Sequence, residues 1–221
     1  MSEDLTATIN ALYRTFGRVP KPRSVESCPH CADPGEPDLL QPVPLRGLTV
    51  KSLRPYAGRA LTTIGGVDDF RYFLPRLLEI ASDGEGFAYP DLATVLGKLS
   101  YGKWTSWAQD EQEAVRGYLR ALWARTLTRD PDDTDVADDT YDAGTVLSAI
   151  ALLEDDLTPY LKAWDEALQR PDDLAAALQL EKVLRDGRRV KRGVPQLTTP
   201  YLNGREAQAG QILAWLEAHS S

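Results

Sequence analysis

Hydrophobic residues recur at three- and four-residue spacing through most of the chain, a pattern typical of amphipathic helices. The pattern is strongest in residues 68–83, where these side chains would share one helical face: Phe70, Phe73, Leu74, Leu77, Leu78 and Ala81. We expect this segment to be the central buried helix, with Asp68 as its N-cap. Pro75 removes a backbone donor inside the segment, which is therefore either two short helices or one kinked helix.

Comparable periodic segments, separated by glycine and proline, predict about nine helices along the chain. No apolar/polar alternation is long enough to predict a strand, and the basic, turn-rich stretch 188–204 is expected to be a connection. The tryptophans have no fixed period, which argues against a regular solenoid repeat. We therefore predict an all-α protein, an irregular bundle of about nine packed helices (helical hairpins), in a single domain over residues 1–221.

Two segments interrupt the helical pattern. Residues 18–44 contain seven prolines and both cysteines, which predicts a long irregular loop. Residues 130–142 contain seven aspartates and no lysine or arginine. This acidic linker lacks the central glycine of an EF-hand loop, so we expect a solvated loop that also supplies a helix N-cap. The basic run that begins at Arg185 could pair with these aspartates or bind an acidic partner or a phosphate.

Composition narrows the function classes. The chain has 221 residues, 43% hydrophobic content and a formal net charge of −8. An acidic chain is repelled by phosphate backbones, which makes nucleic acid an unlikely partner. No apolar run approaches the roughly 18–20 residues of a membrane span, so we expect no membrane partner. The acidic N-terminus lacks the features of a signal peptide, and we expect a cytoplasmic protein.

The sharpest candidate for chemistry is the sequence Cys28-Pro29-His30-Cys31. Cysteines at this spacing can hold a zinc ion or form an exchangeable disulfide, and they can also lie unused in a loop. A zinc site needs four ligands, and His30, between the two thiols, is poorly placed to join them. Completion would need His219 or a second subunit. The redox interpretation lacks the preceding strand and the following helix, so all three alternatives stay open.

A second candidate is a ligand cleft beside the central helix, formed by polar residues of that segment: Arg71, Tyr72, Arg76 and Glu79. Arg76 and Glu79 are also spaced as an ordinary helical ion pair. With two histidines and none of the common nucleotide, zinc-protease or hydrolase motifs, we assign no catalytic residue. The sequence favours a non-enzymatic protein but does not decide whether the chain is an enzyme. It identifies no cofactor.

Several segments together resemble a family of uncharacterised bacterial all-helical proteins. They are the N-terminal C-x-x-C, LRPYAGRALTTIGGVDDFRYFLPRLLEIA, LGKLSYGKWTSW and the terminal AWLEAH, with FLPRLLE the most specific. The resemblance implies a helical fold over most of the chain. It implies no activity, cofactor or catalytic residue.

Two function hypotheses follow. The leading hypothesis is a non-enzymatic helical protein that binds a macromolecular partner, in the first place another protein. An immunity or antitoxin-like role fits the size and acidic charge by analogy alone. The alternative is a metal- or thiol-dependent protein centred on Cys28 and Cys31, as a zinc clip or a redox pair.

Overall fold

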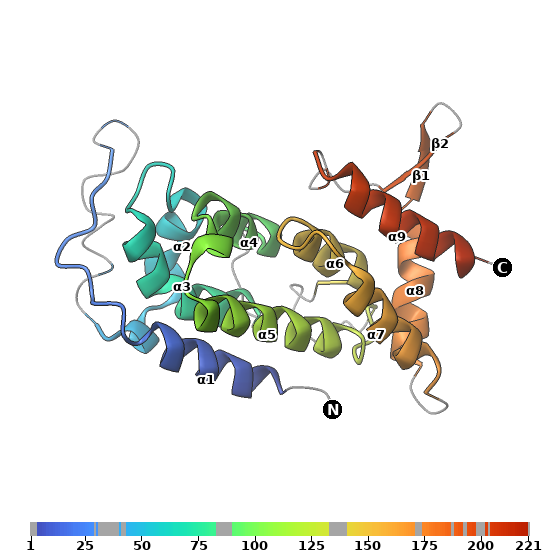
Figure 1. Cartoon of the computed structure of the whole chain (residues 1–221), viewed down its shortest axis with the longest axis horizontal. Helices are drawn as coiled ribbons and strands as arrows, with labels where there is room; N and C mark the ends of the chain where they lie inside the picture. The colour runs from blue at the N-terminus through green and yellow to red at the C-terminus, as the bar shows by residue number, and fades with distance from the viewer. Residues whose placement is uncertain are drawn as a thin grey trace. The chain divides into compact units, whose positions relative to one another are not determined.

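The computed structural model is mainly helical (Figure 1). It describes residues 4–28, 30, 40, 43–82, 90–132, 141–170, 174–186, 188–191, 194–197, 202 and 204–220. The helices within these residues are α1 (Leu5–Phe16), α2 (Val50–Arg59), α3 (Val67–Ala81), α4 (Leu92–Tyr101), α5 (Gln109–Thr126), α6 (Ala143–Ala151), α7 (Thr158–Leu168), α8 (Ala175–Asp186) and α9 (Glu206–Ala218). Short 3-10 turns lie at Leu45–Gly47 and Trp104–Ser106. The predicted fold class, an irregular bundle of about nine helices, is confirmed.

A short β-hairpin lies where the sequence predicted only a connection. Strand β1 (Arg188–Lys191) pairs antiparallel with β2 (Val194–Leu197), so that Arg188 is opposite Leu197 and Lys191 is opposite Val194. Each strand has four residues, and β2 contains a proline. So short an alternation cannot be told from a turn by pattern, and the sequence therefore did not predict the hairpin.

The helices group into two compact units, residues 3–118 and residues 119–221. The first contains α1 to α4 and the beginning of α5, and the second contains the rest of α5 together with α6 to α9. The single domain over residues 1–221 that the sequence predicts stays a prediction. The boundary falls inside the continuous helix α5, next to Gly117, and an isolated glycine within a helical pattern does not predict a break.

Helix α3 forms the core of the first unit, as its periodicity predicts. Phe70, Phe73 and Leu74 are fully buried, and α3 packs against α1, α2 and α4. Pro75 lies inside one continuous helix, which decides between the two alternatives left open by the sequence. The N-cap is Gly66 rather than Asp68, because the Gly66 amide donates to the Asp69 carboxylate at 2.7 Å and the helix begins at Val67.

Tryptophans organise the core of the second unit. Trp164 packs edge-on against Trp123 with ring centroids 5.2 Å apart, and it stacks on Trp215 at 4.6 Å. The indole N–H of Trp123 donates to the Tyr160 carbonyl, and that of Trp164 donates to the Ala176 carbonyl. These bonds satisfy the polar atoms of both buried indoles, so the rings are fixed as well as buried.

The described ends of the acidic linker do what the sequence predicted. Asp142 caps α6 by accepting from the Thr145 amide at 2.8 Å. Asp132 pairs with Lys182 at 3.5 Å and with Arg185 at 3.8 Å on α8. Arg185, at the start of the basic run, therefore pairs with one aspartate of its own chain. Residues 133–140 of the linker lie outside the described residues.

Candidate functional site

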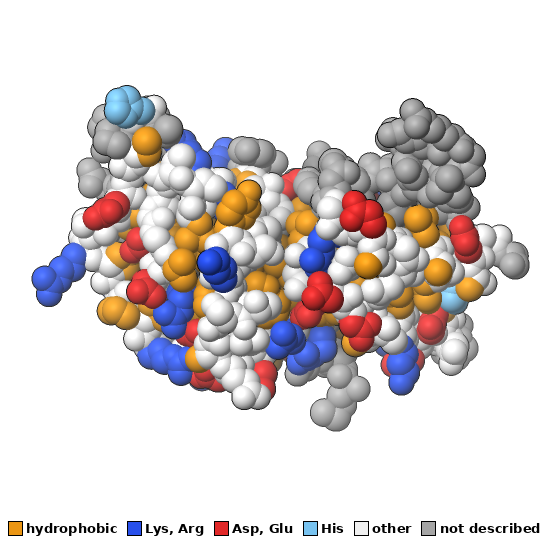
Figure 2. All heavy atoms as spheres, turned by 45° about the horizontal axis from the view of Figure 1, so that its top comes forward, with side chains coloured by type: hydrophobic (Ala, Val, Ile, Leu, Met, Phe, Trp, Pro, Cys, Tyr) orange, Lys and Arg blue, Asp and Glu red, His pale blue; other side chains and the backbone are white. Residues whose placement is uncertain are grey.

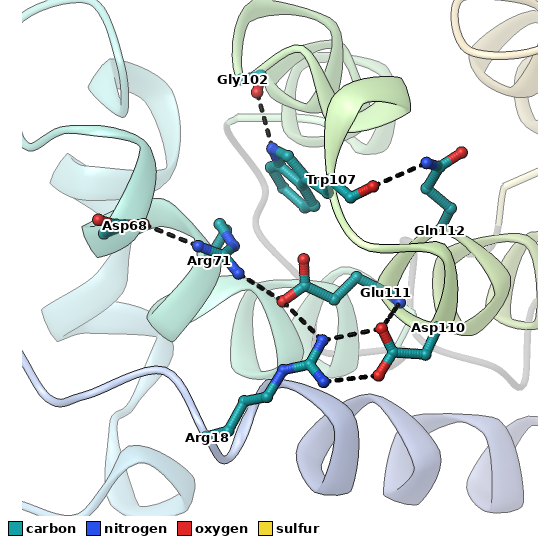
Figure 3. Close-up of polar contacts among 8 residues, drawn as sticks. All are labelled: Arg18, Asp68, Arg71, Gly102, Trp107, Asp110, Glu111 and Gln112. Carbon is teal, nitrogen blue, oxygen red and sulfur yellow. Dashed lines mark hydrogen bonds and ion pairs between the residues drawn. The ribbon is translucent and has the colours of Figure 1, made fainter.

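The most buried charge among the described residues belongs to Glu111, in the first turn of α5. Its side chain is 0% exposed, and its Oε1 accepts from Nη2 of Arg71 at 2.6 Å (Figure 3). Arg71 also donates to Asp68 at 2.8 Å. Arg18, which follows α1, donates to both oxygens of Asp110 and lies 3.4 Å from Glu111. We call Arg18, Asp68, Arg71, Asp110 and Glu111 the Glu111 cluster.

The ionisation of the cluster follows from these contacts. The pKa values of Arg71 and Arg18 are raised, in the first place by hydrogen bonds from Arg71 to Glu111 and from Arg18 to Asp110. The same Arg18 bond lowers the pKa of Asp110 below its ordinary value. Arg18, Arg71 and Asp110 therefore stay charged at neutral pH.

Trp107 lies beside the Glu111 cluster and is fixed from two sides (Figure 3). Its indole N–H donates to the Gly102 carbonyl at 2.9 Å, and its own carbonyl accepts from the Gln112 amide at 2.9 Å. The Arg71 guanidinium lies 5.9 Å from the Trp107 ring centroid. Two buried atoms of the ion pair, Oε2 of Glu111 and Nε of Arg71, have no hydrogen-bond partner. The arrangement is that of a rigid interhelical ion pair.

A second polar cluster lies at the other end of α3. Glu79 accepts from the Tyr13 hydroxyl and from Nη1 of Arg76, and it lies 3.6 Å from Arg46. Arg76 also donates through Nε to the Leu48 carbonyl at 2.8 Å. Burial and the Glu79 carboxylate raise the pKa of Tyr13 far above its ordinary value. Tyr13 therefore acts as a hydrogen-bond donor and not as a base.

The four residues predicted to line a ligand cleft contact different parts of the fold. Arg71 belongs to the Glu111 cluster, whereas Arg76 and Glu79 pair with each other, as their spacing also allowed. Tyr72 is half-buried with its ring edge-on to Phe73, and burial raises its pKa. Arg71, Arg76 and Glu79 are thus engaged in contacts within the fold, and the ligand cleft stays a prediction.

A groove of about 520 Å³ lies elsewhere in the first unit, beside the N-terminus of α3. Its walls come from two short stretches and one helix residue: Glu26, Ser27, Cys28, Leu61, Thr62, Thr63, Gly65, Gly66 and Asp69. The Cys28 amide donates to the Thr63 carbonyl and the Gly65 amide to the Glu26 carbonyl, each at 2.8 Å. The Thr63 hydroxyl is buried without a hydrogen-bond partner. The groove therefore places Cys28, the first cysteine of the C-x-x-C candidate, beside several polar groups.

The C-x-x-C candidate is described only in part. Cys28 is half-buried in the groove wall, His30 is exposed, and Cys31 lies outside the described residues. Within the described part of the chain, no three His, Cys, Asp or Glu side chains are placed to hold a metal ion. His219 stacks on Trp215, and its Nε2 lies 3.1 Å from Asp165. Its ring is thus already engaged by residues of its own unit.

Sequence reasoning missed the Glu111 cluster, although one signal for Glu111 was present. Glu111 lies four residues before Val115 and seven before Tyr118, so it shares the buried stripe of α5. A carboxylate on such a stripe needs a basic partner, and Arg71 is forty positions away in the sequence. The periodicity could therefore have predicted that Glu111 is buried, but not that Arg71 is its partner.

Comparison of the chain with models of protein families, with curated proteins and with solved structures finds no match. The resemblance to bacterial helical proteins therefore stays a prediction. Among the described helices, none combines the length and the apolar character that a membrane crossing requires.

Proposed function

We propose that this chain is a non-enzymatic helical protein that binds another protein. The observation that supports the proposal most directly is a pair of large apolar side chains left in solvent at the start of α8. Leu174 is 71% exposed and Leu178, one turn later, is 37% exposed. Ala177 between them is exposed as well, so the three form an apolar stripe on one helical face.

The polar residues near the core support a non-enzymatic protein, because they are poorly placed for catalysis. The acids and bases nearest the core of the first unit are held in the Glu111 cluster and around Glu79, with hydrogen bonds of 2.5–2.6 Å. Groups held this way have fixed partners within the fold and are poorly suited to transfer protons to a substrate. Figure 2 shows one face on which basic and acidic side chains are mixed, a surface type compatible with a protein partner.

A capture experiment tests this proposal. The tagged chain serves as bait in extracts of the organism that encodes it, beside a double variant, L174S/L178S, and a control, E181S, on the same helix. We expect a partner in stoichiometric amount with the wild type and E181S, and a strongly reduced amount with L174S/L178S. Equal capture by all three, or turnover of a small substrate without any partner, would contradict the proposal.

A second candidate function is a thiol- or zinc-dependent one centred on Cys28 and Cys31. The specific observation in its favour is that backbone bonds to Thr63 and Gly65 fix the Cys28 segment in the wall of the groove. Zinc is measured by elemental analysis after purification without chelator. Less than about a tenth of an equivalent would exclude a closed thiolate site, which holds zinc tightly. Thiols that do not react before or after mild oxidant, with C28S/C31S as the blank, would exclude the redox pair.

A further inference from the structure

Lys98 is a buried lysine in α4. Its residue exposure is 7%, although lysine is almost never this buried unless an acid pairs with it. Its neighbours on the helix, Leu96 and Leu99, are fully buried, so the aliphatic part of the side chain extends along the edge of the core. The position therefore removes most water from the Lys98 side chain.

The Lys98 ammonium has no acidic partner among the residues that the structure describes. Other lysines of the chain do: Lys182 lies 3.5 Å from Asp132, and Lys162 lies 3.9 Å from Glu166. Burial lowers the pKa of Lys98, as expected for a cation that has lost water and gained no counter-charge. The contact that it does make is with an aromatic ring, since Nζ lies 5.5 Å from the centroid of Tyr101.

Tyr101 is unusual in the opposite sense. It is 68% exposed at the last position of α4, one turn after Lys98 and on the same face. Tyrosine is enriched at the centres of protein interfaces, because it offers a large, rigid contact area and one hydroxyl. An exposed tyrosine thus lies beside an ammonium that has no acidic partner among the described residues, and together they offer an apolar and a charged contact.

The local charge selects the partner group. Residues 92–109 contain two lysines and no acidic residue, whereas the chain as a whole carries a net charge of −8. Screening limits the influence of distant charges to about 10 Å at ordinary ionic strength. The stretch that carries Lys98 is therefore positively charged within an acidic chain, which favours a negative group as its partner.

We propose that Lys98 and Tyr101 form a recognition point for a carboxylate on the protein partner, with the acid paired to the Lys98 ammonium and its chain packed on the Tyr101 ring. This inference rests on the proposed function, because it assigns part of the surface through which that partner is bound. A charge-assisted bond to a carboxylate would supply the counter-charge that none of the described residues supplies, next to the exposed ring of Tyr101.

The test uses the full chain and a defined probe, the blocked peptide acetyl-Asp-Glu-Asp-Glu-amide, with acetyl-Asn-Gln-Asn-Gln-amide as the uncharged control. Amide shifts of ¹⁵N-labelled protein report where each peptide binds. We expect the acidic peptide alone to shift residues 98–103, with an effect that weakens as salt is added. K98Q should lower its affinity about tenfold. Y101A, at an exposed position that does not threaten folding, should lower it about threefold.

Two variants serve as controls. K103Q removes an exposed lysine of the same stretch and should leave peptide affinity unchanged. K98R keeps the charge and should retain most of the binding. Shifts that persist in K98Q, or no shift at residues 98–103 at millimolar peptide, would overturn the inference.

The double variant D83N/E85Q covers acids of the chain that lie outside the described residues. If the wild type fails to bind the peptide and this variant binds it, the chain supplies its own acid and the inference is wrong. The readout needs no natural partner, so it is independent of the capture experiment. A captured partner whose binding is unchanged in K98Q would leave the proposed function standing and remove this inference alone.

Discussion

Glu111 carries a carboxylate in surroundings that would exclude an unpaired one. Its side chain is fully buried, and Arg71 and Arg18 supply the compensating charge. Taking two charges out of water costs several kcal/mol per ion, and their attraction offsets that cost only with good geometry. A buried pair of this kind contributes little net stability, yet removing one partner leaves the other charge uncompensated. Substitution of Glu111 should therefore change the free energy of unfolding more than the net contribution of the ion pair suggests.

We expect E111Q to lower the free energy of unfolding by about 2 kcal/mol or more, because glutamine keeps the shape and removes the charge that Arg71 requires. The measurement is urea denaturation followed by tryptophan fluorescence. The matched control is E113Q, on the exposed face of the same helix, where we expect a change within about 0.5 kcal/mol. Equal effects of the two substitutions would show that losing the charge of the buried ion pair costs no more stability than losing an exposed charge.

At the scale of elements, sequence reasoning succeeded where the cause is local. The stripe of α3 and the Asp142 cap of α6 depend on spacings of three or four residues, and both are confirmed. It failed where the cause is distant. Glu111 finds its arginine forty positions away, and the groove around Cys28 exists because residues 26–28 pair with residues 63–65. Single-sequence periodicity contains no information about such pairings.

The junction between the end of α1 and the start of α5 gives a prediction with a definite pH sign. Asp110 is bound by Arg18, which lowers the pKa of its carboxyl below the ordinary value of 3.8. A carboxyl with a lowered folded pKa contributes stability above its unfolded value, and that contribution is lost as the pH falls through the folded value. The stability difference between wild type and D110N should therefore be constant above about pH 5 and shrink below pH 3.8.

Thermal unfolding between acid and neutral pH measures this difference. The Arg18 bond is isolated by repeating the comparison in an R18Q background, since Asp110 also lies near the N-terminus of α5 and gains from the helix dipole there. We expect the pH-dependent part to be mostly absent in that background. If D110N shows the same pH dependence with and without Arg18, the dipole and not the ion pair is its cause.

At the scale of the whole molecule, the division into two compact units raises the question of how far a local defect spreads. Gly65 and Gly210 allow one perturbation in each unit. Gly65 has φ of +67°, and a Cβ there would lie 3.0 Å from the Asp69 carboxylate and 3.2 Å from Val25. Gly210 is exposed inside α9, and a Cβ there would meet nothing within 4 Å. Alanine should therefore destabilise at the first position and stabilise at the second.

We expect G65A to cost more than about 1 kcal/mol and G210A to add about 0.5–1 kcal/mol, because alanine is strained at positive φ but favoured inside a helix. Hydrogen exchange followed by mass spectrometry locates each effect. If each unit opens on its own core, G65A speeds exchange in α2 and α3 and leaves α7 and α9 unchanged, while G210A slows exchange in α9 alone. Faster exchange in α7 and α9 of G65A, by the same factor as in α3, would instead show that the continuous helix α5 couples both units into one cooperative structure.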